Sequence, residues 1–268
     1  MEKNQYLMEH EGEIARLETK TDTDTVRRQA LWAGLDKGMR VADIGCGTGK
    51  TTEVLQDIVG PSGEVVGIDS SQERITYAKQ TYPCSTYLVN DIRSVPPDIG
   101  QFDFIWVRFF LEYYKTDAFE IVDSLGSLLK SEGIMCLIDL DYNCMTHHGL
   151  DEDLELSLIG CMQYLEEQTN FDPYAGRKLY SYLFDLGYAN IEVHMEPHHL
   201  LHGTLNPTDE KNWNAKIDIA LGQSGYRFPE LEGGFEEFRR RIRQYLKQPR
   251  RFTYTPAILC RGVKPGRN

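Results

Sequence analysis

Residues 41–51 read Val41-Ala-Asp-Ile-Gly-Cys-Gly-Thr-Gly-Lys-Thr51, an apolar stretch that runs into three closely spaced glycines and then into a polar segment. This order predicts a buried strand, a tight turn and the start of a helix. Glycines let the backbone turn sharply and let a ligand approach bare backbone N–H groups at a helix N-terminus. The stretch therefore predicts a ligand-binding loop at the carboxyl end of a strand.

Alternating strands and helices with short turns continue on the C-terminal side of this loop. That alternation predicts a doubly wound α/β fold, and the continuous apolar strands fit a sheet that is covered on both faces. The expected strands are 41–44, 64–68, 86–89, 102–107, 134–140, 191–195 and 254–260, and the expected helices are 50–59, 71–80, 117–130, 150–167, 174–186 and 235–246.

Charge and composition exclude several classes of protein. The 268 residues hold 29 Lys+Arg against 41 Asp+Glu, a net charge of −12, which disfavours binding to nucleic acid. Apolar runs fall far short of the ~20 residues that span a bilayer, and the N-terminal residues show no signal-peptide pattern. Six cysteines without a CxxC pair predict free thiols in a reducing cytoplasm. We therefore expect a cytoplasmic protein without stable membrane insertion.

Two nucleotide-binding interpretations of the glycine loop fail on spacing. A P-loop has four residues between its first glycine and Gly-Lys-Thr, and Gly45 lies one residue too close to Gly49-Lys-Thr51. The dinucleotide fingerprint G-x-G-x-x-G has two residues before its third glycine, where this chain has one. A nucleotide-dependent enzyme that uses this P-loop-like turn is kept as the weaker alternative.

The spacing D-x-G-x-G-x-G, from Asp43 to Gly49, resembles motif I of the class I S-adenosylmethionine-dependent methyltransferases. Asp69 ends the second strand, where an acidic side chain can accept both ribose hydroxyls. Asn90-Asp91-Ile92 and the segment 102–114 resemble the family's adenine-contacting and fourth-strand motifs. The resemblance is to the small-molecule subgroup, which includes quinone and natural-product methyltransferases. It assigns the cofactor S-adenosylmethionine to Asp43, Gly45, Cys46, Gly47, Thr48, Gly49, Asp69, Ser70, Asn90, Asp91, Ile92 and Arg108.

The resemblance also implies a Rossmann-like, mostly parallel sheet of seven strands with an antiparallel last strand, and helical insertions that form a lid. Such a lid lies over the strand carboxyl ends, where this architecture binds ligands. The predicted division is a helical cap at 1–35, a cofactor-binding core at 36–141 that continues at 173–202, helical insertions at 142–172 and 203–250, and a last core strand with a tail at 251–268.

The implied reaction is methyl transfer to a small organic acceptor, with a cofactor-binding protein without catalytic activity as the alternative. Val107-Arg-Phe-Phe110 replaces the (Asn/Asp)-Pro-Pro-(Tyr/Phe) motif of enzymes that methylate nucleic-acid bases. A general base is needed only if the nucleophile starts protonated, so no fixed catalytic residue is expected. Candidates by position are Tyr113, Asp139, His147 and His148, with Glu112 and Asp141 near the same strand ends.

Histidines and arginines form two further groups in the C-terminal half of the chain. Four histidines between 194 and 202 lack cysteine or carboxylate partners, so we predict a strand end and loop and no metal site. Arginines at 239–243 alternate with apolar residues, which predicts an amphipathic helix packed on the core.

Overall fold

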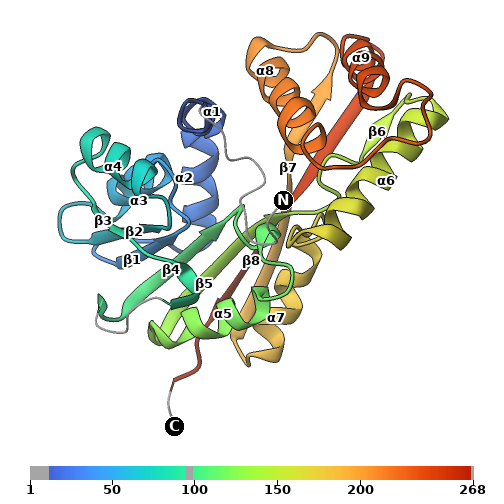
Figure 1. Cartoon of the computed structure of the whole chain (residues 1–268). Coiled ribbons are helices and arrows are strands. Elements are labelled where there is room, and N and C mark those ends of the chain that lie inside the picture. Colours follow the sequence, from blue (N-terminus) through green and yellow to red (C-terminus); the bar gives the residue numbers. More distant parts are fainter. Residues whose placement is uncertain (1–11, 95–98, 267–268) are drawn as a thin grey trace.

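The computed structural model describes residues 12–94 and 99–266, and its centre is a twisted sheet (Figure 1). The sheet order is β3-β2-β1-β4-β5-β8; β7 and β6 both pair with β8. Neighbouring strands from β3 to β5 are parallel, and β8 runs antiparallel to β5, as predicted. The strands are β1 Arg40–Ile44, β2 Glu64–Asp69, β3 Thr86–Val89, β4 Phe102–Arg108, β5 Leu129–Leu140, β6 His147–His148, β7 Ala189–His202 and β8 Phe252–Val263.

Helices cover both faces of this sheet, which confirms the doubly wound α/β fold. Val41 packs on one face with α2 and α3, whereas Ala42 and Ile44 pack on the other with α5 and α7. Burial on both sides explains why β1 is apolar throughout. The helices are α1 Glu13–Lys20, α2 Thr23–Trp32, α3 Lys50–Val59, α4 Gln72–Thr81, α5 Ala118–Ser127, α6 Glu152–Gln168, α7 Leu179–Asp185, α8 Pro207–Ala215 and α9 Gly234–Leu246, with short 3-10 turns at Ile92–Ser94 (η1), Leu111–Tyr113 (η3) and Gly176–Lys178 (η4) and a π-helical segment at Lys216–Leu221 (η5).

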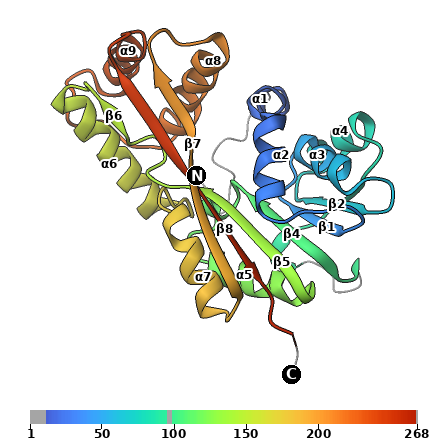
Figure 2. The ribbon, with the colours of Figure 1, turned by 180° about the vertical axis from the view of Figure 1, so that it is seen from behind.

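Residues 12–94 and 99–266 form one strand more than the seven expected. The extra strand is β6, whose two histidines pair with Thr253 and Phe252 of β8. Strands β7 and β8 are also longer than expected and run together beyond the sheet (Figures 1 and 2). Their pairing shifts register between Pro197 and His199, an irregularity of the kind that lets proline sit in a strand.

The two insertions pack together on the far part of this ribbon and share one apolar core. Helix α6 comes from the first insertion, and α8, η5 and α9 come from the second. Phe228 and Phe238 are fully buried between them, and Trp213 joins the same core. We call α6, α8, η5 and α9 the helical unit. Within the described ranges, no helix is long and apolar enough to cross a membrane.

The arginines of α9 hold the helical unit together on its outer side, and α9 is amphipathic as predicted. The Arg241 guanidinium pairs with Asp151, the N-cap of α6, at 2.5 Å and with Glu237 at 3.2 Å. Arg243 pairs with Asp218 of η5 at 2.6 Å. Each exposed pair of this kind contributes about 0–1 kcal/mol, so the pairs fix geometry more than stability.

Candidate active site

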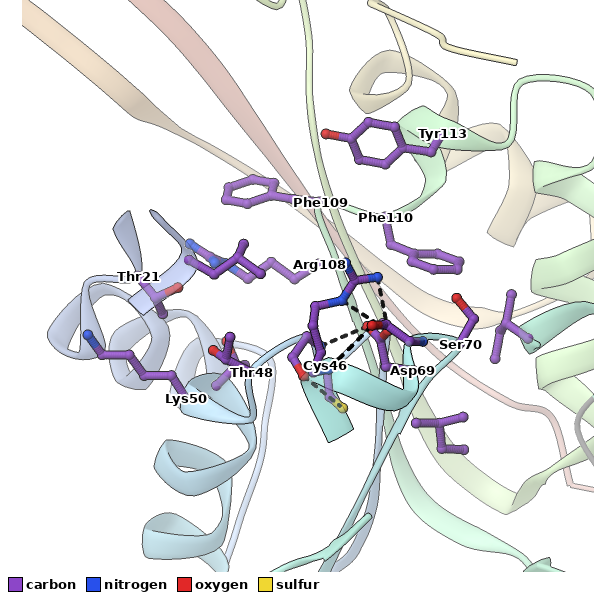
Figure 3. A pocket seen from close by; sticks show the side chains of 18 of the residues that line it. Thr21, Cys46, Thr48, Lys50, Asp69, Ser70, Arg108, Phe109, Phe110 and Tyr113 are labelled. Carbon is purple, nitrogen blue, oxygen red and sulfur yellow. Dashed lines mark hydrogen bonds and ion pairs between the residues drawn. The ribbon is translucent and has the colours of Figure 1, made fainter. Parts of the chain in front are cut away.

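A cavity of about 420 Å³ lies at the carboxyl ends of β1, β2 and β4, beside α1 (Figure 3). This is the edge at which open α/β sheets bind ligands. Among the predicted cofactor residues, those that line it are Gly45, Cys46, Gly47, Thr48, Asp69, Ser70, Asn90, Ile92 and Arg108. Asp43, Gly49 and Asp91 do not line the cavity; among the candidate bases, Tyr113 does, and Asp139, His147 and His148 do not.

The glycine loop presents backbone to the cavity because side chains would not fit there. Gly45 has φ +69°, and a Cβ on it would lie 2.4 Å from Cδ2 of Phe110. The backbone N–H groups of Gly45 and Cys46 both donate to the Ile68 carbonyl, which ties the loop to β2. The loop is therefore a closely packed cradle that a ligand can approach without meeting a side chain at position 45.

Gly45→Ala is expected to destabilise the protein by about 2–4 kcal/mol, the sum of a positive-φ penalty and overpacking against Phe110. Gly187→Ala is the matched control: Gly187 also has a positive φ, +75°, but no atom lies within 4 Å of its added Cβ. Urea unfolding of both variants measures the difference. Equal losses would show that the contact with Phe110 imposes no constraint.

Asp69 organises the loop from the end of β2. Its carboxylate accepts the Gly47 N–H at 2.9 Å and the Ser71 N–H at 2.9 Å, and it pairs with the Arg74 guanidinium at 3.2 Å. The Ser71 hydroxyl caps α4 by accepting the Arg74 N–H, as expected for a serine at this position. Asp69 thus joins the loop, the β2 end and α4, with its carboxylate at the cavity wall.

The other two acidic residues of the expected cofactor site have local partners. Asp43 is buried beneath the loop, where it accepts the Thr52 hydroxyl at 2.7 Å. Burial raises the pKa of Asp43 to about 7. Asp91 pairs with Arg93 at 2.5 Å, and only its neighbours Asn90 and Ile92 line the cavity. Of the three acids, Asp69 is the one on the cavity wall.

Helix α1 rests on the glycine loop, a contact that sequence patterns do not reveal. The Lys50 ammonium, from the first turn of α3, donates to the Glu18 carbonyl of α1. The Tyr82 hydroxyl donates to the Glu18 carboxylate at 2.7 Å. The lysine that imitates a P-loop lysine therefore anchors α1 beside the cavity.

The end of the cavity beyond β4 is aromatic and basic. Phe109 has a positive φ of +53°, and two cations contact its ring: the Arg108 guanidinium lies 4.1 Å and the Lys20 ammonium 5.3 Å from the ring centroid. The His198 ring meets Phe109 edge-on at 4.6 Å. Figure 3 shows Arg108, Phe109 and Tyr113 along this side of the cavity. Lys20 and His198 were not predicted as site residues; the histidine group was expected to form a strand end and loop, but β7 continues through it.

The structure places some of the candidate general bases at the cavity and others away from it. Asp139 is fully buried, and its carboxylate accepts the N–H groups of Glu112 and Leu140. His147 lies on β6 beside the helical unit, where its ring binds the Thr253 hydroxyl and the Cys144 carbonyl, each at 2.9 Å. The hydrogen bonds of Asp139 and His147 therefore connect neighbouring segments of the backbone, and neither side chain reaches the cavity. Tyr113 and its neighbour Glu112 are the candidates that border the cavity.

Comparison with known proteins shows that part of this architecture matches a known family. Residues 41–133, which carry β1 to the start of β5 and the glycine loop, match a family model described as a methyltransferase domain. This segment resembles a methyltransferase domain. Its predicted resemblance to class I S-adenosylmethionine-dependent methyltransferases is thereby confirmed.

Two curated relatives and one solved structure illustrate the likeness. The trans-aconitate 2-methyltransferase of Escherichia coli is 34% identical over 97 residues, 36% of this chain and 37% of that enzyme. The demethylmenaquinone methyltransferase of Staphylococcus aureus is 32% identical over 108 residues, 39% of this chain and 44% of that enzyme. The chain thus spans less than half the length of both relatives.

The structure of Haemonchus contortus phosphoethanolamine N-methyltransferase 2, in complex with phosphomonomethylethanolamine and S-adenosylhomocysteine, shares the fold. It aligns with a TM-score of 0.57 at 17% identity, over 94% of this chain and 57% of that chain. At this identity the likeness is one of architecture, and it extends beyond the methyltransferase domain into the C-terminal half.

Proposed function

We propose that the protein transfers a methyl group from S-adenosylmethionine to a small organic acceptor. The observation that carries the proposal is the Gly45–Gly49 loop beside Asp69, in the segment that matches the methyltransferase domain. A small acceptor is favoured by the net charge of −12 and by the names of the curated relatives. The sequence spacing and the pairing of Lys50 with α1 do not favour a nucleotide site.

The residues that line the cavity supply groups that suit this cofactor. The glycines at 45 and 47 let the cofactor approach the backbone closely, and the Arg108 guanidinium suits the methionine carboxylate, because N–H donors bind carboxylate oxygens. Asp69, at the end of β2, suits the ribose hydroxyls. Asn90 and Ile92 line the side where the adenine ring would lie.

The protein's contribution is alignment and exclusion of water. When bound, the cofactor supplies an electrophilic methyl group on a sulfonium. Holding the acceptor in line with that group is worth on the order of 7–11 kcal/mol. We propose that α1 and the helical unit form the lid that positions the acceptor, since α1 contacts both the glycine loop and α8. Tyr113 borders the acceptor side and is the proposed proton acceptor if the nucleophile is protonated.

Calorimetric titration tests the cofactor first. We expect S-adenosylmethionine and S-adenosylhomocysteine to bind with micromolar affinity and ATP with magnesium to give no heat. Transfer of a radioactive methyl group to a panel of small acids, phenols and amines then tests the reaction. Cofactor binding without transfer to any acceptor would support the non-catalytic alternative, and ATP binding alone would overturn the proposal.

A further inference from the structure

Cations outnumber acids in the cavity wall, although the whole chain carries a net charge of −12. Most of these cations have anionic or carbonyl partners. Arg16 pairs with Glu13 at 2.6 Å, and the ammonium of Lys50 donates to a backbone carbonyl. Arg74 and Arg93 pair with the aspartates described above. The cations of interest are therefore those around the Phe109 ring.

Lys20 has no acidic partner within residues 12–94 and 99–266. Its ammonium has no hydrogen bond or ion pair there, and its contact is with the Phe109 ring. Burial, together with the positive charges of Arg16, Lys216 and Arg108, lowers the pKa of Lys20 to about 7, against the opposing charge of Glu112. This end of the cavity thus has a positive potential that the protein itself does not neutralise.

Besides Arg108 at the end of β4, the groups that face Lys20 come from three elements, and none supplies a free anion. Glu112 on η3 is buried, which raises the pKa of its carboxyl, and it accepts a hydrogen bond from Asn143 at 2.8 Å. Lys216 on η5 contacts the same Asn143 and adds positive charge. His198 on β7 stays neutral, because burial lowers its pKa well below the usual value. Its Nε2 is buried without a partner in the described part of the chain.

We propose that the acceptor carries an oxyanionic group, a carboxylate or a phosphate monoester, which docks beside Phe109 against the Lys20 ammonium. This proposal rests on the proposed function, and it leaves Arg108 to the carboxylate of the cofactor. The aromatic rings of Phe109, Phe110 and Tyr113 would cover the apolar part of such an acceptor. Lys216 does not line the cavity, but its positive charge near Lys20 adds to the attraction for the anionic group.

Binding to the protein saturated with S-adenosylhomocysteine tests the proposal without requiring turnover. The probes are cinnamate, trans-aconitate and phenyl phosphate, with cinnamamide as the neutral match of cinnamate. At pH 6, a unit below the pKa of Lys20, we expect an anion to bind at least tenfold more tightly than cinnamamide. Preference for the two carboxylates identifies a carboxylate acceptor, and preference for phenyl phosphate identifies a phosphate monoester.

Variants separate a direct role of Lys20 from a structural one. Lys20→Met should lose the anion preference, and Lys20→Arg should keep it. Lys130→Met is the control for net charge, because Lys130 pairs with Asp103 at the amino edge of the sheet. Equal anion binding by the wild type and Lys20→Met, equal binding of cinnamate and cinnamamide, or no anion binding would each overturn the proposal.

The pH dependence provides a second readout. Above pH 7 Lys20 loses its proton, so wild-type anion affinity should fall by up to about tenfold per pH unit. Lys20→Arg keeps its charge and should show a flatter profile. The affinity for S-adenosylhomocysteine is measured in the same titrations. If that ligand does not bind, the proposed function fails; if it binds without an anion preference, only this inference fails.

Discussion

Asp69→Ala is expected to lower the affinity for S-adenosylhomocysteine by at least about a hundredfold, roughly 2.7 kcal/mol. The carboxylate holds the Gly47 N–H of the loop and the Arg74 guanidinium, and it is only 8% exposed. The substitution therefore removes the proposed ribose acceptor, releases the loop and leaves a buried guanidinium without its carboxylate. Removing one partner from a buried pair costs about 3–5 kcal/mol, so the folded state is weakened as well.

Calorimetry on Asp69→Ala, beside thermal unfolding, separates these two effects. Asp57→Ala is the matched control, because the Asp57 side chain is 60% exposed, pairs with Arg27 and lies outside the cavity lining. Arg74→Met removes the buried cation and keeps the carboxylate. If Asp69→Ala remains folded and binds as tightly as the wild type, Asp69 does not hold the cofactor.

Phe238→Ala is expected to destabilise the helical unit by about 3–5 kcal/mol while S-adenosylhomocysteine affinity changes less than about threefold. Phe238 is fully buried between α6, η5 and the Phe228 ring, and truncation of such a ring removes its contacts and leaves a cavity. The glycine loop and Asp69 belong to other elements. If the helical unit positions the acceptor, methyl transfer should fall much more than cofactor affinity.

Hydrogen exchange followed by mass spectrometry gives the stability of the helical unit separately from that of the sheet. Phe184→Ala provides the control, because the Phe184 side chain is 62% exposed on α7 and its truncation creates no internal cavity. A parallel loss of cofactor affinity in Phe238→Ala would mean that the helical unit and the loop fold as one cooperative structure.

The elements of the sheet were predictable because their signals are local. Helix α3 and strand β3 have the predicted bounds, since glycine-rich turns bracket α3 and a continuous apolar run defines β3. The cavity also lies where the strand carboxyl ends predicted it. In contrast, the strand predicted at 191–195 was too short. The residues Glu196-Pro-His-His199 lie within β7 but are not the apolar run that a buried strand was expected to have.

The part of the cavity around Phe109 was not predictable, because it depends on packing between distant segments. Lys20 and His198 are 178 positions apart in the chain, and each meets Phe109 only in the folded protein. Helix α8 did carry a start signal, Asn206 followed by Pro207, and the Asn206 side chain does cap it. Its single buried aromatic residue, Trp213, gave too weak a periodicity to be recognised.

The shared core of α6, α8, η5 and α9 limits how this protein can be recombined with its relatives. The first insertion contributes Leu158 and Leu165 to that core, and the second contributes Phe228 and Phe238. A chimera that exchanges only one insertion would place mismatched apolar surfaces against each other. Overpacking and voids each destabilise a folded core by about 1–5 kcal/mol. Transplanting acceptor preference into another enzyme of this fold therefore requires that both insertions move together, with the β7–β8 ribbon that carries them.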